Sequence, residues 1–332
     1  MPRLYLKEYG RALAGKPVYI ACREGILRDH LSEIVADIKF LVRHGLRTHL
    51  LHNLPNRFAN RKLIAQLSDR LPATRLVRIA PQSDFYEAVL NHRAFMFKTI
   101  FLERGFLVDP HGNKINAVTT GRMRDAMADV KDLIANVNFK DALACICQKI
   151  ESGQCNRVHI LPAGRHTIKH ELFTVEGSGT LIANDFKEDF RQVQTDEEVA
   201  IVFRILQMYR RSGYLKPRTK GYLNKNRARF FVTAIDGIVV GCVEQKIIDA
   251  HTVELGALAI STRFRNQRVG VHTVTAFMEL MRSQGFRRFI SLTNNPRLEA
   301  LYTQIGFVQE SRPEYGERQA GSPGVKMFFK AD

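Results

Sequence analysis

A basic, glycine-containing loop lies between two apolar segments, and its residue types could hold an anion. The loop reads Ser261-Thr-Arg-Phe-Arg-Asn-Gln-Arg-Val-Gly-Val-His272. The apolar run 253–260 before it is typical of a buried strand, and apolar residues at helical spacing over 271–283 predict a helix after it. Backbone N–H groups at a helix start, together with the helix dipole, bind an anion without any catalytic side chain. The sequence therefore predicts a phosphate-binding loop. Three arginines add positive charge to it: Arg263, Arg265 and Arg268.

A second patterned segment, Asn295-Pro-Arg-Leu-Glu-Ala-Leu-Tyr302-Thr-Gln-Ile-Gly306-Phe307, follows a strand predicted over 286–293. The spacing Arg265-x-x-Arg268-x-Gly270 and this segment resemble, in order, two motifs of the Gcn5-related N-acetyltransferase (GNAT) family. In that family the loop cradles the pyrophosphate of acetyl-CoA. Arg268 stands where the family has its first glycine, and Leu298 stands where it has an alanine. The resemblance implies a GNAT domain with acetyl-CoA as its cosubstrate.

The same resemblance implies a set of site residues. Tyr302 is the expected proton donor to the departing CoA thiolate, and the alternative is a tyrosine that only packs in the core. Glu254 is the expected acceptor of the amine proton through water. Two alternatives remain: a carboxylate paired with a neighbouring arginine, or proton removal by bulk water. Backbone N–H groups near Gly256 are expected to polarise the thioester carbonyl, as on the family's bulged strand. The expected cofactor-binding residues are Leu258, Ala259, Ile260, Arg265, Asn266, Gln267, Arg268, Val269, Gly270, Val271 and Asn295.

Two arginines are candidates to bind the carboxylates of an amino-acid acceptor, because a planar guanidinium matches a carboxylate with two parallel hydrogen bonds. Arg218 ends a segment, Gly213-Tyr-Leu-Lys-Pro-Arg218, that resembles a G-x-L-x-x-R segment of bacterial N-acetylglutamate synthases. Arg318 lies in a run that approximates one near the end of those proteins. Leu215 and Ala257 are expected to line the acceptor site.

The first half of the chain predicts a parallel α/β sheet, because strand and helix patterns alternate along it. The run from Val118 to Ile182 resembles the end of the amino-acid-kinase domain that bacterial N-acetylglutamate synthases carry in front of their acetyltransferase domain. Ala21-Cys-Arg-Glu-Gly25 stands where kinases of that family have a lysine and paired glycines, and the middle of the domain is short for the family. The resemblance implies a reduced, non-catalytic domain over residues 1–184 and a GNAT domain over 185–332, joined by a polar linker over 184–193.

Length and composition set further expectations. A chain of 332 residues exceeds the usual single-domain size. The net charge of +17 is spread along the sequence, and a polyanionic cofactor accounts for part of it, so nucleic-acid binding is not favoured. The apolar runs fall short of the roughly 18 residues that span a membrane, and the first residues lack a secretory signal pattern, so a cytoplasmic location is expected. Five cysteines without a C-x-x-C motif disfavour a disulfide framework, and no ligand cluster supports a metal site.

The sequence thus predicts an α/β protein with an N-terminal amino-acid-kinase-like parallel α/β sandwich and a C-terminal GNAT mixed α/β fold. The expected reaction is direct acetyl transfer from acetyl-CoA to the α-amino group of glutamate or a related amino acid, in arginine biosynthesis. Two alternatives remain open: acetylation of another small amine in secondary metabolism, and a non-catalytic CoA-binding regulator. The segment around Tyr302 favours the first alternative, because bacterial glutamate synthases usually carry a tryptophan-phenylalanine pair near there. The first domain is expected to mediate homo-oligomerisation and to have lost the loops through which arginine inhibits the synthases.

Overall fold

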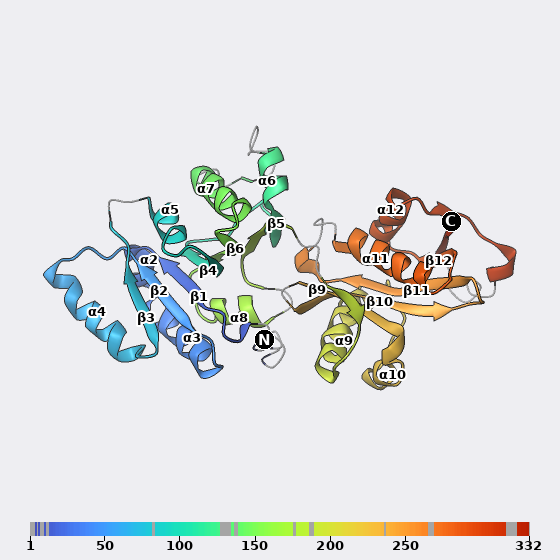
Figure 1. Cartoon of the computed structure of the whole chain (residues 1–332), viewed down its shortest axis with the longest axis horizontal. Helices are drawn as coiled ribbons and strands as arrows, with labels where there is room; N and C mark the ends of the chain where they lie inside the picture. The colour runs from blue at the N-terminus through green and yellow to red at the C-terminus, as the bar shows by residue number, and fades with distance from the viewer. Residues whose placement is uncertain are drawn as a thin grey trace. The chain divides into compact units, whose positions relative to one another are not determined.

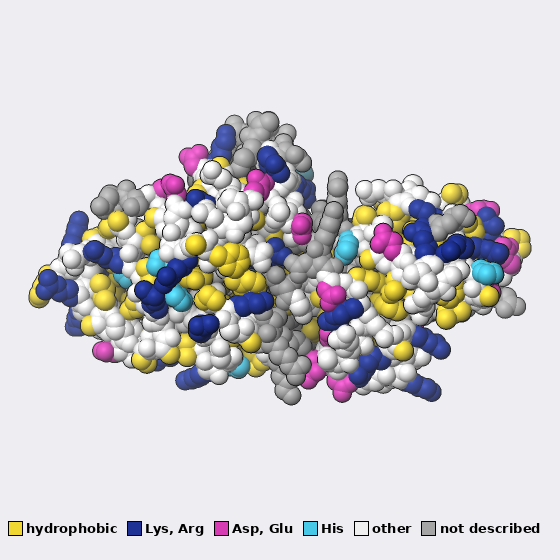
Figure 2. All heavy atoms as spheres, viewed as in Figure 1, with side chains coloured by type: hydrophobic (Ala, Val, Ile, Leu, Met, Phe, Trp, Pro, Cys, Tyr) yellow, Lys and Arg dark blue, Asp and Glu magenta, His cyan; other side chains and the backbone are white. Residues whose placement is uncertain are grey.

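The computed structural model divides into two compact units, residues 1–186 and 187–332; the sequence predicted a boundary after residue 184. Each unit is built around its own sheet (Figure 1). Lys and Arg side chains are spread over the visible face of both units rather than gathered in one stripe (Figure 2). No helix in the described part of the chain combines the length and apolarity needed to cross a bilayer. The structure describes residues 4, 6, 10, 13–81, 84–126, 134–135, 139–174, 177–185, 189–235, 237–264, 269–316 and 324–331.

The first unit contains a seven-stranded sheet in the order β3-β2-β1-β4-β6-β7-β5. Its strands are β1 (Val18–Cys22), β2 (Thr48–His52), β3 (Thr74–Arg78), β4 (Met96–Glu103), β5 (Ala117–Thr119), β6 (Cys155–Pro162) and β7 (Thr180–Ala183). Neighbouring strands are parallel except β6 and β7. Every residue of β1 is buried, as expected for a central strand covered on both faces. The predicted α/β sheet is confirmed, and it is parallel apart from the pair β6 and β7.

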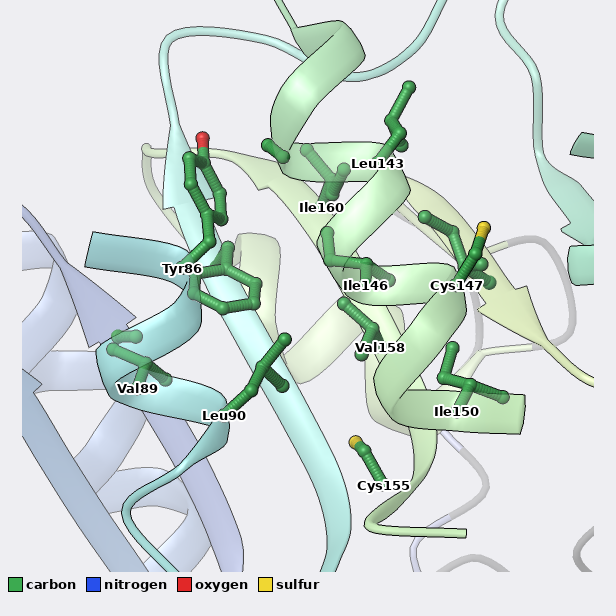
Figure 3. Packing of buried hydrophobic residues seen from close by; sticks show 14 of the residues in the cluster. Tyr86, Val89, Leu90, Leu143, Ile146, Cys147, Ile150, Cys155, Val158 and Ile160 are labelled. Carbon is green, nitrogen blue, oxygen red and sulfur yellow. The ribbon is translucent and has the colours of Figure 1, made fainter. Parts of the chain in front are cut away.

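Helices cover this sheet through apolar stripes. The helices are α2 (Glu24–Asp29), α3 (Leu31–Arg43), α4 (Phe58–Arg70), α5 (Phe85–Leu90), α6 (Thr120–Ala126), α7 (Lys140–Glu151) and α8 (Thr167–Phe173). Val89 and Leu90 of α5 share a core with Ile146 and Ile150 of α7 and with Val158 of β6 (Figure 3). This shared core joins elements that lie far apart in the sequence.

The second unit contains a mixed seven-stranded sheet in the order β13-β14-β12-β11-β10-β9-β8. Its strands are β8 (Phe190–Gln192), β9 (Phe230–Ile235), β10 (Ile238–Ile247), β11 (Thr252–Ile260), β12 (Arg288–Thr293), β13 (Val308–Gln309) and β14 (Lys326–Ala331). Neighbouring strands are antiparallel except β11 and β12, which are parallel. β8 lies inside the segment 184–193 that was predicted as a linker. Its residues pair with β9, so this part of the segment belongs to the second sheet.

Two pairs of helices lie on opposite sides of this sheet, α11 and α12 on one and α9 and α10 on the other (Figure 1). Their bounds are α9 (Asp196–Arg211), α10 (Lys220–Lys225), α11 (Val269–Ser283) and α12 (Pro296–Gln304). α9 begins with a capping box between Thr195 and Glu198, which satisfies backbone N–H groups at the helix start. α11 buries Val274, Phe277 and Met281 against the sheet. Single-turn 3-10 helices follow β11 and α10 and precede β14.

Candidate active site

The parallel strands β11 and β12 pair only at their beginning. Their ladder joins Thr252 to Arg288, Val253 to Phe289 and Glu254 to Ile290. β11 nevertheless continues to Ile260 and β12 to Thr293. Beyond the ladder a side chain replaces a backbone donor: the Ser291 hydroxyl donates to the Leu255 carbonyl at 3.2 Å. The two strands therefore diverge at the centre of the sheet.

β11 also carries a bulge at this point. Cys242 of β10 lies opposite Ala259 and Glu244 lies opposite Gly256, so two residues of β11, Ala257 and Leu258, face one residue of β10. Ala257 has a positive φ of 46°, which is uncommon for a residue with a side chain. A bulge takes backbone groups out of the ladder. The strand that the sequence predicted to present N–H groups to a carbonyl therefore has backbone geometry suited to that task.

Two adjoining cavities lie beside the diverging strands. The larger has a volume of about 440 Å³ and is lined by Met208, Tyr209, Ser212, Tyr214, Thr262, Asn295, Pro296 and Arg297. The smaller has a volume of about 20 Å³ and is lined by Tyr209, Tyr214, Leu215, Leu255, Ala257, Leu258, Ser291, Leu292, Thr293, Asn295, Leu298 and Tyr302. Three residues line both, so the wide cavity leads to a narrow space between the strands.

Tyr302 of α12 lines the narrow space and is fully buried. The Ser291 and Tyr302 hydroxyl oxygens lie 2.8 Å apart, within hydrogen-bond distance, and the Tyr302 ring packs against Phe307 and Phe328 with centroid distances of 5.1 and 5.6 Å. Burial raises the pKa of Tyr302, and the nearby Glu254 adds to this effect. The phenol therefore keeps its proton at neutral pH. The buried phenol lies beside the space between the strands, and its predicted role as proton donor stays a prediction.

Glu254 is buried on β11 opposite Lys246 of β10, and its Oε1 lies 2.5 Å from the Lys246 ammonium nitrogen. Lys246 is thus one partner of Glu254, and the expected alternative of a pair with an arginine stays open. Glu254 is absent from the residues that line the two cavities described above. Its predicted role as proton acceptor stays a prediction.

Arg218 bonds a carboxylate of its own chain. Its Nε and Nη2 donate to Oε2 of the fully buried Glu244 at 3.0 and 2.7 Å. Its Nη1 donates to the Lys216 carbonyl at 3.4 Å. All three guanidinium nitrogens thus have partners, and the predicted binding of an acceptor carboxylate by Arg218 stays a prediction. Arg318 lies outside the described residues.

The predicted cofactor residues fall into four groups. Leu258 and Asn295 line the narrow space, and Asn295 also caps α12 by accepting from the Arg297 N–H at 3.1 Å. Ala259 and Ile260 complete β11. Arg265, Asn266, Gln267 and Arg268 lie outside the described residues.

The fourth group, Val269, Gly270 and Val271, forms the start of α11. A Cβ on Gly270 would lie 2.7 Å from Leu301 Cδ1 of α12. The glycine therefore lets the two helices approach closely beside the loop that was predicted to bind phosphate.

Sequence reasoning missed four residues of the site: Tyr209, Ser291, Glu244 and Lys246. Glu244 could have been found, because it stands next to the apolar run 238–243 of β10, and a buried charge requires a partner. Ser291 gives no such signal, since a serine in a strand is common. Its importance depends on where the ladder between β11 and β12 ends.

Parallel strands that diverge in a mixed sheet, a bulge on one of them and a helix start beyond it agree with the GNAT fold that the sequence predicted for the second unit. Comparison with known proteins agrees: residues 183–307 match the acetyltransferase (GNAT) family. The amino-acid acetyltransferase of Pseudomonas fluorescens Pf-5 is 28% identical over 209 residues, 62% of this chain and 46% of that protein. The amino-acid acetyltransferase of Pseudomonas syringae pv. syringae is 24% identical over 308 residues, 91% of this chain and 65% of that protein. The chain thus spans about half to two thirds of the length of these relatives.

A solved structure extends the likeness to the whole chain. It is N-acetylglutamate synthase from Neisseria gonorrhoeae complexed with coenzyme A and L-arginine, with a TM-score of 0.57, 17% sequence identity, and coverage of 98% of this chain and 97% of that one. At this identity the likeness concerns the fold. The predicted fold class, an amino-acid-kinase-like α/β domain before a GNAT domain, and the predicted resemblance to N-acetylglutamate synthases are confirmed.

Proposed function

We propose that this chain is an acetyl-CoA-dependent N-acetyltransferase that acts on the α-amino group of an amino acid, glutamate or a related one. The observation that carries the proposal is the divergence of β11 and β12 next to the buried hydroxyl of Tyr302. The names of the relatives support the acceptor class. With glutamate as acceptor, the reaction would belong to arginine biosynthesis, as the resemblance implies.

In the proposed reaction the chain's own groups each have one task. Backbone N–H groups at the start of α11 bind the pyrophosphate, with help from the arginines of the preceding loop. An N–H group of the bulge at Leu258 polarises the thioester carbonyl and stabilises the negative charge that develops on its oxygen. The amine nitrogen attacks the carbonyl carbon, the carbon–sulfur bond breaks, and Tyr302 gives its proton to the sulfur. The amine proton leaves to water, or through water to Glu254.

The state of the Cys242 thiol favours direct transfer of the acetyl group to the amine over a mechanism with an acetylated cysteine. Cys242 lies on β10 next to the bulge, with its sulfur 3.8 Å from the Ala257 carbonyl oxygen. It is fully buried, and burial raises the pKa of the thiol to about 12. The thiolate, which is the nucleophilic form of cysteine, is therefore scarce at neutral pH.

A scaffolding and oligomerising role is the proposal for the first unit. Ligands of parallel sheets bind beyond the carboxyl ends of the strands. After β1, at that edge, the Arg23 guanidinium lies over the rings of Phe85 and Tyr86, 5.3 and 5.0 Å from their centroids. The Tyr86 hydroxyl donates to Glu103 at the end of β4 at 2.7 Å. These contacts occupy the edge with side chains, where kinases of the resembled family have a lysine and glycines.

The test is acceptor-dependent release of free CoA from acetyl-CoA, followed with a thiol reagent over a panel of amino acids, amines and polyamines. Release that requires an α-amino acid and saturates with it would support the proposal. Release only with amines that lack a carboxylate would favour the alternative acceptor class. CoA binding by calorimetry without release for any acceptor would favour the regulator.

A further inference from the structure

Glu244 of β10 has a buried carboxylate that is hydrogen-bonded to one short segment of the chain. Its side chain has no solvent exposure. Arg218 donates to Oε2 through two nitrogens, and the Tyr222 hydroxyl donates to Oε1 at 2.5 Å. A buried carboxylate without such partners would be strongly unfavourable. The three hydrogen bonds come from residues four positions apart, so a single carboxylate joins the residue before the N-cap of α10 to a residue within that helix.

The segment that Glu244 holds also forms one wall of the candidate active site. Tyr214 and Leu215 line the narrow space between β11 and β12, and both lie between the end of α9 and Arg218. Tyr214 is held from the α9 side, where its N–H donates to the Tyr209 carbonyl at 3.1 Å.

On the other side of Arg218 is α10, a helix of six residues. A helix of this length has little stability of its own. The Glu244 carboxylate is the charged attachment of this segment to the sheet, beside the buried side chain of Leu223 and the contact of the Tyr222 ring with Phe230 of β9.

We infer that Glu244 is a positioning residue that fixes residues 214–222 and thereby sets the acceptor side of the active site. In this arrangement Arg218 is the structural partner of Glu244 rather than a ligand of the acceptor carboxylate. The inference rests on the proposed acetyltransferase function. It predicts that weakening the contact affects the acceptor and not acetyl-CoA, because the described start of α11 lies on the other side of the sheet.

The principal variant is Glu244→Gln, which keeps the shape of the side chain and removes its charge. A hydrogen bond to a charged group contributes more than a neutral one, so KM for the acceptor should rise about 10- to 100-fold. KM for acetyl-CoA should change less than about 2-fold, and kcat at saturating acceptor should fall less than about 5-fold, since Tyr302 is untouched and the substitution keeps the backbone pairing of residue 244 with Gly256. Asp196→Asn is the matched control, because Asp196 pairs with Arg227 at the exposed start of α9. It should leave both KM values unchanged.

Two milder variants keep the inference testable if Glu244→Gln does not fold. Tyr222→Phe removes one hydrogen bond from a partly exposed ring and should raise the acceptor KM about 3-fold. Arg218→Gln and its combination with Glu244→Gln complete a double-mutant cycle. If the two residues act as one contact, the double variant should be no worse than the worse single variant. Additive losses would show that Arg218 binds the acceptor directly and would overturn the inference.

Hydrogen exchange separates this inference from the proposed function. Amide exchange over residues 212–222 requires no substrate, and Glu244→Gln should speed it there while leaving α11 and α12 unchanged. Faster exchange would support the positioning role even if no acceptor in the panel were acetylated. Exchange rates equal to those of the unmodified protein, or equal increases in both KM values, would overturn it.

Discussion

The two units differ in how far their parallel strands pair with one another. In the first unit β4 and β6 pair along their length, from Met96 with Cys155 to Glu103 with Pro162. In the second unit the parallel pair β11 and β12 stops after Glu254 and Ile290. A complete ladder satisfies the backbone and leaves no space between strands, whereas an interrupted one leaves polar groups and a cavity at the centre of the sheet.

Each unit has a buried carboxylate, and the two carboxylates hold different kinds of segment. In the first unit Glu171 bonds His159 at 2.5 Å and accepts from the N–H groups of Ser178 and Gly179 at 2.6 and 3.0 Å. A Cβ on Gly179 would lie 2.2 Å from the Ile160 carbonyl oxygen, so this turn packs directly on β6. Glu171 thus stabilises a turn within a closed core, while Glu244 of the second unit holds a segment that lines a cavity. The chemistry that we propose thus lies where strand pairing is interrupted.

Removing the Tyr302 hydroxyl should have the largest effect. Tyr302→Phe should lower kcat by about 100- to 10,000-fold, the usual contribution of a general acid, with little change in the Kd of acetyl-CoA. Stopped-flow or steady-state release of CoA measures kcat, and calorimetry measures the Kd. Tyr315→Phe is a matched control, because Tyr315 is a second buried tyrosine whose hydroxyl lies 3.2 Å from that of Thr252. A fully active Tyr302→Phe variant would reduce Tyr302 to a packing residue.

Gly270 tests the cofactor side of the second unit. Gly270→Asp should weaken acetyl-CoA binding more than about 10-fold, because a carboxylate at the start of α11 repels the pyrophosphate. Gly270→Ala is the steric control: its Cβ meets only the mobile end of Leu301 and a more distant Ile260 atom. The alanine variant should retain most of the affinity, as measured by calorimetry on both folded proteins. Equal affinities for the two variants would mean that the anion binds elsewhere.

The elements of both units could be predicted because local patterns determine them. Asn295 followed by proline predicts a helix start, and the structure has an N-cap there. The apolar runs of the first half predict buried parallel strands. The pairing of Arg218 with Glu244 could not be predicted, because the two residues are 26 positions apart and meet only through the fold. The same holds for the end of the ladder between β11 and β12, on which the contact of Ser291 with Tyr302 depends.

Disrupting Glu171 should have a large effect on stability and a small one on chemistry. Glu171→Ala removes one partner of a buried pair, which typically costs about 3–5 kcal/mol, and it leaves the Ser178 and Gly179 N–H groups without their acceptor. Thermal denaturation should show a lower Tm for the first unit. kcat per folded molecule, measured below that temperature, should stay within about 2-fold. Glu151→Ala is the control, since Glu151 pairs with Arg124 on the surface. Loss of kcat in a folded Glu171→Ala protein would show that the first unit takes part in catalysis.

Arginine should have the smallest effect. Inhibition requires that arginine bind two conformations with different affinity, because a ligand with equal affinity for both shifts nothing. The related synthase from Neisseria gonorrhoeae was crystallised with L-arginine, but the first unit of this chain is expected to lack the loops that arginine inhibition requires. The rate at subsaturating acceptor should therefore stay flat as arginine is titrated into the millimolar range, with lysine as the control for ionic strength. A saturable fall in rate with arginine that lysine does not reproduce would show that the first unit still senses an amino acid. The first unit would then be a regulatory domain rather than a scaffold.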